Sequence, residues 1–384
     1  MTTITVVTGA RSEYGIYQPV LRKLHEDEEL DLNLIVTGMH LAPEFGMTVS
    51  AVEADGFAIR DRVEMLLASD SPEGVAKSVG LGVIGFAQAY AKCRPDLLLV
   101  LGDRFEMLAA VLASMTFKIP IAHIHGGEST EGLIDEPIRH SITKMSHLHF
   151  AATETYARRI IQMGEQPQRV VVSGAPALDH LETIELLDRD QFRERFRIDV
   201  AEPPLLVTFH PVTLEFEQTD YHIDELLAAL SEIDRPVVFT YPNADTQGRL
   251  ILERIESFAD NNPRAHIAAN LGTQGYFSLM SHAAAMVGNS SSGIIEAASF
   301  QLPVVNIGNR QRGRVHEGNV IGVGHHREEV AGGIRRVLLP EFRAELRNLV
   351  NPYGDGHAAE RIVNKLRATE LGQELVMKRF HDFD

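Results

Sequence analysis

The sequence predicts an α/β protein with two domains, each built on a parallel sheet. Short apolar runs alternate with helical patterns, as where Leu97–Leu101 is followed by a helical pattern over Glu106–Ser114. Such alternation is typical of parallel βαβ units. The length of 384 residues fits two domains of this kind. In open parallel sheets the ligand lies outside the carboxyl ends of the strands, so the residues that follow each strand are the functional candidates.

Composition and charge exclude several classes of protein. The formal net charge of −17 disfavours binding to nucleic acid or to an anionic membrane. The apolar runs are shorter than the roughly 20 residues that span a bilayer, and the N-terminal segment lacks the basic region of a signal peptide. The single cysteine, Cys93, excludes a disulfide framework and a CxxC metal site. We therefore expect a cytoplasmic protein without nucleic-acid or membrane partners.

The first strand–turn–helix unit carries a candidate phosphate ligand. Thr3–Thr8 is a predicted strand, and Gly9–Gly15 is the predicted turn into a helix. Arg11 then lies beside the free N–H groups of a helix start, which favours a diphosphate; the alternative is a solvated arginine. A second strand, Leu32–Thr37, leads into a loop with His40, for which a ligand contact and a structural role both remain open.

A formal GxGxxG match at Gly80–Gly85 is in the wrong context for a dinucleotide site. That motif needs a strand before it and a helix opening at it, whereas residues 71–93 read as helix on both sides of the glycines. We expect the small residues to allow close helix packing, and we expect no nicotinamide.

The densest set of ionisable groups lies in residues 95–149. Asp103 follows the strand Leu97–Leu101, and the strand Ile119–His125 leads into an acidic, glycine-rich loop that contains Glu128 and Asp135. These side chains are expected at one edge of the sheet. Because crowded carboxylates raise one another's pKa, they suit general acid–base catalysis.

Structural explanations for these residues stay open at this stage. Asp135 could be the N-cap of the next helix, and Asp103 could cap the helix that follows it. Arg139, four residues after Asp135, could be its ion-pair partner or a substrate ligand. His123 could be a core histidine rather than a ligand.

The second half of the chain repeats the α/β pattern. Strands are predicted at Leu148–Ala151 and Val170–Ser173, and the charge-rich segment Leu181–Pro204 is the predicted linker. Beyond it, His210 follows one predicted strand and Asn243 follows the next. The tail from His357 reads as one long helix that can return to the first domain.

A serine cluster is the predicted anion site. Gly288–Gly293 follows a buried strand and opens a helix, so its three hydroxyl groups and free N–H groups can cradle phosphates. Glu296 lies one helical turn past Ser292, where it suits paired ribose hydroxyls. The expected contributors are Ser290, Ser291, Ser292, Gly293, Glu296, Arg310 and Arg314. Ordinary N-capping explains one serine but not the whole cluster.

The motifs together resemble the hydrolysing UDP-N-acetylglucosamine 2-epimerases, which supply N-acetylmannosamine for sialic acid synthesis. They cover nearly the whole chain in the family's order: TGARSEYG, VTGMHLAPEFG, LGDRFE, HIHGGE, DEPIRHSITKMSHLHF, FHPVT, YPNAD, GNSSSGIIE, GNRQRGRV and NPYGDG. The resemblance implies two Rossmann-like domains facing a cleft, as in B-type glycosyltransferases, with the C-terminal helix crossing back to the first domain. The implied bounds are 1–182 for the domain with the acid–base residues, 183–356 for the nucleotide-binding domain and 357–384 for the returning helix.

The resemblance also implies ligands and chemistry. A nucleotide-sugar and UDP are the expected partners, with no cofactor and no metal, in a homodimer or homotetramer. Ser290, Ser291, Glu296 and Arg310 would hold the uridine diphosphate, with Arg11 near the phosphates. Because His210 lies at a strand end beside the cleft, we expect it to contact the substrate or the leaving group, and a structural role is the alternative. A base removes the C2 proton as the C1–O bond to UDP breaks, and water then adds at C1 while C2 is protonated from the opposite face. Asp103 and Asp135 match positions associated with this catalysis.

One position departs from a branch of the family. That branch has a catalytic Glu two residues after the first His of HIEGGE, where this chain has His125. Either His125 takes the acid–base role, which its usual pKa near 6.5 allows, or Glu128 does. The main expectation is conversion of UDP-N-acetylglucosamine to free N-acetylmannosamine and UDP. The alternatives are the same reaction on a UDP- or GDP-linked 2,4-diacetamido-trideoxy sugar, as in legionaminic acid pathways, a non-hydrolysing epimerase or a B-type glycosyltransferase, and a non-catalytic sugar-nucleotide sensor.

Overall fold

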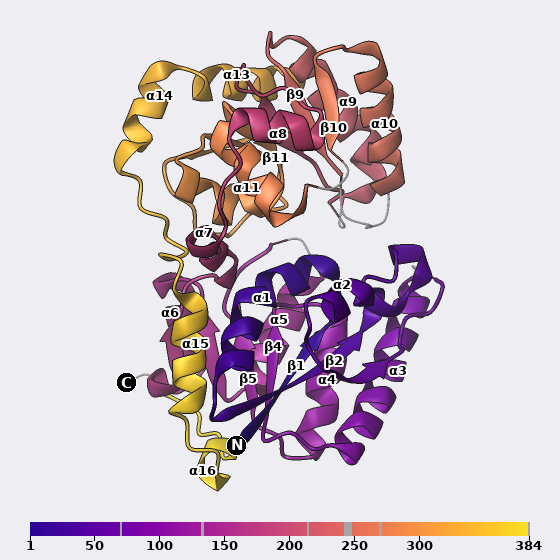
Figure 1. Cartoon of the computed structure of the whole chain (residues 1–384), viewed down its shortest axis with the longest axis vertical. Helices are drawn as coiled ribbons and strands as arrows, with labels where there is room; N and C mark the ends of the chain where they lie inside the picture. The colour runs from indigo at the N-terminus through magenta and orange to yellow at the C-terminus, as the bar shows by residue number, and fades with distance from the viewer. Residues whose placement is uncertain (70, 132–133, 213–214, 242–247, 269–270, 383–384) are drawn as a thin grey trace. The chain divides into compact units, whose positions relative to one another are not determined.

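The structure of this chain is a computed structural model that describes residues 1–69, 71–131, 134–212, 215–241, 248–268 and 271–382. It divides into two compact units (Figure 1). Unit 1 contains Met1–Glu128, Ile134–Glu182 and Tyr353–Asp384, and unit 2 contains Ser129–Leu133 and Thr183–Pro352. Among the described residues, no helix combines the length and the apolarity needed to cross a membrane.

Unit 1 is built on a seven-stranded parallel sheet of order β3-β2-β1-β4-β5-β6-β7. Its strands are β1 (Thr2–Thr8), β2 (Leu30–Thr37), β3 (Ile59–Val63), β4 (Leu97–Leu101), β5 (Ile121–Ile124), β6 (Leu148–Ala151) and β7 (Val170–Val172). Its helices are α1 (Arg11–Glu26), α2 (Val49–Ala54), α3 (Pro72–Lys92), α4 (Phe105–Thr116), α5 (Asp135–Met145), α6 (Glu154–Gln162), α15 (Ala358–Arg367) and α16 (Gln373–Val376), with α7 (His180–Thr183) at the unit boundary.

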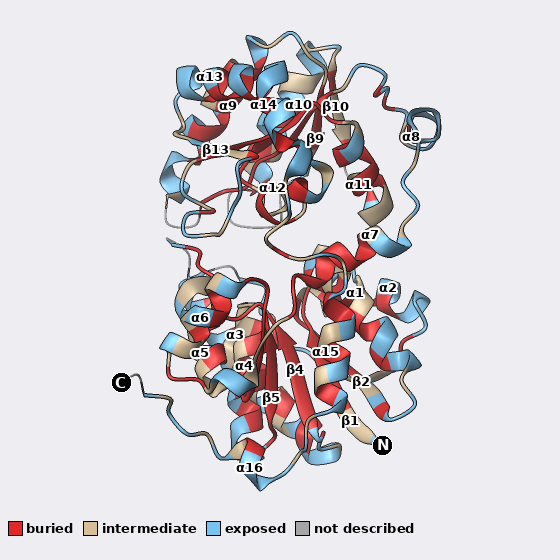
Figure 2. Ribbon diagram, turned by 90° about the vertical axis from the view of Figure 1, so that its left-hand side faces the viewer, coloured by how far each residue is buried: buried red, intermediate tan, exposed pale blue. Residues whose placement is uncertain are grey.

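The core of unit 1 forms because its central strands are apolar on both faces. Every residue of β4 is buried, as is every residue of β5, and both strands are red along their length in Figure 2. One face is covered by α1 and by α15, whose Ile362 and Leu366 join the same hydrophobic cluster as Leu21 of α1. The other face is covered by α3 and α4.

Unit 2 repeats this architecture on a six-stranded parallel sheet of order β10-β9-β8-β11-β12-β13. Its strands are β8 (Leu205–Thr208), β9 (Val237–Thr240), β10 (Ala265–Ala268), β11 (Ala285–Gly288), β12 (Val304–Ile307) and β13 (Val320–Val323). Its helices are α8 (Arg189–Phe196), α9 (Thr219–Ser231), α10 (Gly248–Asn261), α11 (Gly272–His282), α12 (Ser292–Ile295), α13 (Arg327–Val337) and α14 (Pro340–Glu345).

Both sheets have one topological switch point, where the strand order reverses. It lies between β1 and β4 in unit 1 and between β8 and β11 in unit 2. Ligands of open α/β sheets bind at this point, outside the carboxyl ends of the strands. In unit 1 it brings together the loops that follow β1 and β4, and in unit 2 the loops that follow β8 and β11.

The predicted α/β class with two parallel sheets is confirmed, and three local predictions are corrected. The turn expected over Gly9–Gly15 is shorter, because α1 already begins at Arg11. The expected linker Leu181–Pro204 contains α8, which a capping box from Asp188 and Gln191 starts. The tail is not one long helix, because α15 ends at Arg367 and a short α16 follows Gly372.

Candidate active site

In unit 1, a buried arginine gathers the acidic groups that follow β4 and β5. Arg139 lies in the second turn of α5, and its side chain is only 1% exposed. Its guanidinium donates to the Asp103 carboxylate, to Glu136 Oε2 at 2.8 Å and to the Glu128 carbonyl oxygen at 3.0 Å. The Asp103 side chain remains 24% exposed and so can still reach a ligand.

Asp135 titrates near neutrality in this environment. Burial, and then the charge of Asp103, raise its pKa to about 6, although Arg139 and Arg104 oppose the shift. Asp135 is the first residue of α5, where Ile134 occupies the N-cap position and makes no side-chain capping bond. Arg104 likewise precedes α4 at the N-cap, so the structure gives neither Asp103 nor Asp135 the capping role that remained open.

His125 and Glu128 form a hydrogen-bonded pair at the end of β5. His125 has a left-handed backbone with φ 63°, unusual for a residue other than glycine and often a mark of a functional site. Its Nδ1 donates to Glu128 Oε1, and among the described residues its buried Nε2 has no hydrogen-bond partner. A carboxylate on Nδ1 fixes the tautomer in which Nε2 carries the lone pair.

Two other histidines of unit 1 are structural in this geometry. His40 Nε2 lies 3.1 Å from Thr8 Oγ1, and its Nδ1 lies 2.7 Å from Thr48 Oγ1. Because both ring nitrogens are occupied within the protein, the substrate contact expected of His40 finds no support here. His123 is bonded to Thr143 and to the Gly102 carbonyl. Burial lowers the pKa of His40 to about 4 and that of His123 to about 3, so both rings are neutral.

Two further buried acidic residues, Glu13 and Glu106, lie near this site and were not predicted from the sequence. Glu106 is fully buried and bonded to Arg104 at 3.0 and 3.2 Å. Glu13 is also buried, and burial raises its pKa well above the usual range. Both residues lie within motifs that were recognised, TGARSEYG and LGDRFE. Their proximity appears only once β1 and β4 lie side by side. Arg11 is the first residue of α1, and its side chain is exposed.

In unit 2, Asn289 joins the loops that follow three strands. Its amide accepts from His210 N at 2.7 Å and donates to the His210 carbonyl at 2.8 Å. Its own carbonyl accepts from Arg310 at 3.2 Å and from Gln311 at 2.9 Å. Burial, and then the charge of Arg310, lower the pKa of His210 well below the usual value, so its imidazole is neutral. Asn289 was not predicted as a site residue.

The serine cluster lies at the switch point of unit 2 but opens only one helical turn. α12 spans Ser292–Ile295, and Glu296 follows its end with a helical backbone and donates its N–H to the Ser292 carbonyl at 3.0 Å, so it lies one turn past Ser292 as expected. Tyr276 of α11, also missed from the sequence, lies near the hydroxyls of Ser292, Thr208 and Ser290, which act to lower its pKa. Burial, and then Glu296, raise its pKa to about 12.

The remaining predicted residues of unit 2 fall into two groups. Gly293 is buried within α12, and Arg310 and Arg314 lie in the segment after β12, as expected. Asn243 lies outside the described residues. The structure therefore gathers the acid–base candidates in unit 1 and most of the nucleotide candidates in unit 2.

A possible metal site in unit 2 does not have converging ligands. Ligand atoms of Glu215, His222 and His325 all lie within 4.8 Å of one another. However, the two imidazole rings stack with centroids 3.5 Å apart and planes 8° from parallel. The lone pair of an imidazole lies in the ring plane, so two stacked rings do not direct their nitrogens at one ion. The expectation of no metal stays a prediction.

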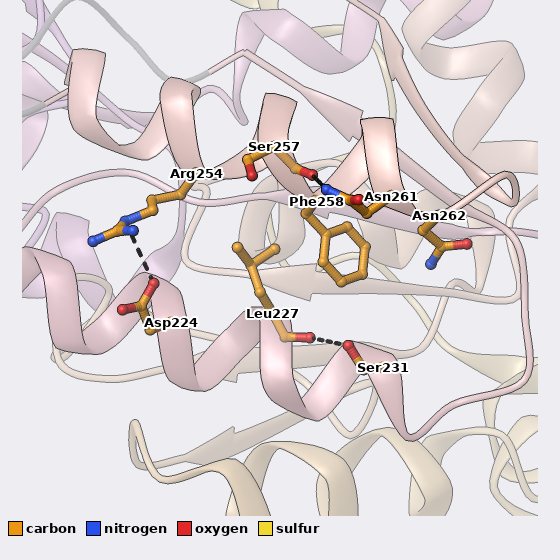
Figure 3. Close-up of a pocket in the computed structure, with 8 residues that line it drawn as sticks. All are labelled: Asp224, Leu227, Ser231, Arg254, Ser257, Phe258, Asn261 and Asn262. Atoms are coloured by element: carbon orange, nitrogen blue, oxygen red, sulfur yellow. Dashed lines mark hydrogen bonds and ion pairs between the residues drawn. The ribbon is translucent and has the colours of Figure 1, made fainter.

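Unit 2 also has an open groove of about 460 Å³ between α9 and α10, and its lining residues are not those of the candidate site (Figure 3). Arg254 crosses its mouth and pairs with Asp224, while Leu227 and Phe258 form its floor. None of the predicted site residues lines this groove, so the candidate site rests instead on the loops at the carboxyl ends of the strands.

The comparison with known families decides the assignment. The model of the family described as UDP-N-acetylglucosamine 2-epimerase matches residues 22–367. The chain belongs to this family.

Within the UDP-N-acetylglucosamine 2-epimerase family, the relatives differ in their named substrates. The chain is 38% identical to the UDP-N,N'-diacetylbacillosamine 2-epimerase (hydrolyzing) of Legionella pneumophila, over 98% of both chains. It is 38% identical to the GDP/UDP-N,N'-diacetylbacillosamine 2-epimerase (hydrolyzing) of Campylobacter jejuni, over 83% of both. Identity to the UDP-N-acetylglucosamine 2-epimerase of Neisseria meningitidis is 28% over the full length of both.

Solved structures of the family share this fold. The crystal structure of UDP-GlcNAc 2-epimerase from Neisseria meningitidis bound to UDP-GlcNAc matches with a TM-score of 0.82 and 20% identity, over 95% of this chain and 99% of that one. The Methanocaldococcus jannaschii UDP-GlcNAc 2-epimerase in complex with UDP-GlcNAc and UDP matches with a TM-score of 0.80 and 20% identity, over the same shares. At this identity the likeness concerns the fold alone.

Proposed function

We propose that this family member is a hydrolysing 2-epimerase whose substrate is a nucleotide-linked 2,4-diacetamido-trideoxy sugar. The observation that carries the catalytic part is the grouping of Asp103 and Asp135 around Arg139, with the pKa of Asp135 raised to about 6. A carboxyl group that titrates near neutral pH can both take and give a proton. The hydrogen-bonded His125–Glu128 pair lies at the adjacent strand end and is a second candidate for proton transfer.

The reaction proceeds in two balanced steps. A base takes the C2 proton while the bond between C1 and the diphosphate oxygen breaks, so the electron pair forms a C1–C2 double bond and the nucleotide leaves. A water oxygen then bonds to C1, its proton passes to an acceptor, and C2 receives a proton from the face opposite the original one. The products are the free 2-epimeric sugar and the nucleoside diphosphate.

The roles follow from what each group can do. Asp103 and Asp135 act on the sugar, and the buried Arg139 holds the Asp103 carboxylate in place through an ion pair. His125 exchanges a proton through Nε2, and Glu128 orients it. The nucleotide is assigned to the unit 2 residues Ser290, Ser291, Ser292, Gly293, Glu296, Arg310 and Arg314, with Arg11 near the phosphates and His210 near the leaving group. Tyr276, which lies near this serine cluster, joins that set.

The choice of sugar rests on the relatives. Two relatives at 38% identity carry diacetylbacillosamine names, whereas the relative at 28% carries the UDP-N-acetylglucosamine name. These matches favour the diacetamido substrate over the UDP-N-acetylglucosamine that was the main expectation from the motifs. UDP-N-acetylglucosamine is therefore the second candidate substrate, and a homodimer or homotetramer stays a prediction.

Product analysis tests this proposal. The protein is incubated with the UDP- and GDP-linked diacetamido sugars and with UDP-N-acetylglucosamine, and the released sugar is identified by NMR. We expect free 2-epimeric sugar and nucleoside diphosphate, with a kcat/KM about 10-fold or more higher for a diacetamido substrate. A nucleotide-linked product would indicate a non-hydrolysing epimerase, a sugar transferred to an acceptor would indicate a glycosyltransferase, and binding without turnover would indicate a sensor.

A further inference from the structure

The C-terminal residues 374–381 make a set of contacts that the proposed reaction does not explain. We refer to them as the C-terminal strap. Arg169 donates to the carbonyl oxygens of Leu375 at 2.9 Å and Glu374 at 2.7 Å. At the other end, His381 N donates to the Gly164 carbonyl at 2.9 Å. The strap is thus tied at both ends to the segment that follows α6.

Lys378, between these ties, binds the C-terminal end of α5. Its Nζ donates to the carbonyl oxygens of Lys144 at 2.6 Å and Ser146 at 2.5 Å. The last carbonyls of a helix lack partners within the helix and carry the negative end of its dipole. An ammonium group at this position therefore satisfies two acceptors and stabilises the helix end.

The same ammonium group completes a buried ionic cluster. Lys378 pairs at 2.7 Å with Glu165, which also pairs with Lys144 of α5 at 2.6 Å and is bonded to His149 of β6 at 3.1 Å. Glu165 is only 1% exposed. A buried carboxylate with fixed partners holds them in one arrangement, because losing a partner leaves an uncompensated charge.

Phe380 adds a non-polar contact to this arrangement. Its ring packs against Gly164, whose backbone is left-handed with φ 85°, and no side chain fits there beside the ring. The ammonium group of Lys144 lies 5.1 Å from the ring centroid. Two residues of the strap therefore hold the last turn of α5.

α5 is the helix that carries Asp135 and Arg139 in its first two turns. At that end it is held by the Arg139 contacts with Asp103 and with the Glu128 carbonyl. Lys144 lies nine residues after Asp135, about 14 Å along the helix axis.

Thr143 of α5 is also bonded to His123, and Lys144 pairs with Glu165, so α5 has further contacts besides those of Arg139. Without the strap, however, the C-terminal end of α5 loses the Lys378 and Phe380 contacts and is freer to tilt, which would move Asp135. A displacement of about 1 Å at a catalytic group can cost much of the rate.

We propose that the C-terminal strap positions the catalytic helix α5, with Lys378 as the positioning residue. This inference rests on the proposed function, since it assigns the strap to the same proton-transfer site. The added claim is that the C-terminal strap affects kcat without contacting the substrate.

The test compares three variants of the full chain. Lys378→Met removes the ammonium group, Lys378→Arg keeps the charge and the donors, and Arg379→Met changes the exposed neighbouring side chain as a matched control. At a temperature where circular dichroism shows each variant folded, we expect Lys378→Met to lower kcat about 10-fold with KM and UDP affinity within two-fold. Lys378→Arg should recover most of kcat, and Arg379→Met should leave it unchanged.

Hydrogen exchange of the α5 amides supplies a measurement that needs no substrate. We expect exchange over residues 140–146 to be about 10-fold faster in Lys378→Met and unchanged in Arg379→Met. If Lys378→Met does not fold, Phe380→Ala takes its place, with about a three-fold loss of kcat expected. An absence of turnover in the unmodified protein would reject the proposed function, while the exchange result would still decide the inference. Folded Lys378→Met with unchanged kcat, or with unchanged α5 exchange, would overturn it.

Discussion

His125 donates through Nδ1 to the carboxylate of Glu128, three residues further along the same loop. The two side chains are 9% and 3% exposed, so little water competes for this bond. A carboxylate on one ring nitrogen leaves the other as the group that can exchange a proton with a ligand. Where the family branch has a catalytic Glu, this chain therefore has an imidazole with its own carboxylate partner.

Replacing Glu128 should reduce turnover through His125. We expect Glu128→Gln to lower kcat about 100-fold, because an amide can donate to Nδ1 and so reverse the tautomer. Glu131→Gln is the control, since Glu131 lies in the same loop but is exposed and pairs with Arg312. Steady-state kinetics decide whether His125 or Glu128 exchanges the proton with the sugar. An active His125→Gln together with an inactive Glu128→Gln would mean that Glu128 acts directly on the sugar.

Substitutions of the acid–base residues in unit 1 should affect mainly turnover, whereas substitutions of the nucleotide residues in unit 2 should affect mainly UDP affinity. Asp103→Asn and Asp135→Asn should lower kcat about 100-fold or more while UDP affinity changes less than about three-fold. Glu296→Gln and Arg310→Met should weaken UDP binding about 10-fold instead. Calorimetric titration with UDP alone measures affinity without turnover. If Asp135→Asn loses UDP binding as severely as turnover, Asp135 is not confined to the sugar chemistry.

The raised pKa of Asp135 should make the folded state less stable as pH rises. Because its pKa is about 6 in the folded protein and 3.8 ordinarily, the folded state binds more protons between these values, and stability falls as pH rises through about 6. Asp135→Asn removes this cost, so at pH 7 the variant should be more stable than the unmodified protein by about 1–2 kcal/mol, with no such gain near pH 4. Urea unfolding measures the difference.

Asp31→Asn is the matched control for that experiment, since Asp31 is exposed on β2. It should show no pH-dependent gain. A rise in kcat/KM with pH through about 6 that disappears in Asp135→Asn would link the same group to the reaction. A stability gain of equal size at pH 4 and pH 7 would contradict the assignment.

Glu165 should have the opposite effect on the pH dependence of stability, because its pKa is lowered. Burial alone would raise its pKa, but hydrogen bonds from His149, Lys144 and Lys378 outweigh burial and lower it to about 2. Its stabilisation is therefore present above its usual pKa of 4.5 and is lost as pH falls toward 2. We expect Glu165→Gln to cost about 3 kcal/mol at pH 7, because the lysines lose their partner, and clearly less at pH 3. A cost that does not shrink at pH 3 would contradict this account.

The central strands could be predicted because burial on both faces leaves a continuous apolar signal. β4 was predicted with its observed bounds, and β11 and β12 were recognised from similar runs. The edge strands β3, β10 and β13 were missed. β3 has the sequence IRDRV, whose alternating burial reflects an exposed edge and not a core position. β3 therefore lacks the apolar pattern on which the prediction depends, whereas the edge strand β7, with the sequence VVV, keeps that pattern and was predicted.

Candidate site residues could be named from the sequence where they directly follow a strand. They were harder to name where their role depends on a contact with another residue. Asp103 and His125 could be found because strand ends mark the ligand edge of a parallel sheet. The sequence could not show that Arg139 pairs with Asp103, or that Thr8 bonds one nitrogen of His40, since those contacts join segments more than 30 residues apart. Tyr276 and Asn289 were missed because neither residue type signals a role without its neighbours.

The fate of the C2 hydrogen tests the account most directly. In deuterium oxide, elimination followed by hydration exchanges the C2 proton with groups that have equilibrated with solvent. NMR of the free sugar released from its nucleotide should therefore show one deuterium at C2 in every product molecule. Released sugar that carries only hydrogen at C2 would contradict the proposed mechanism.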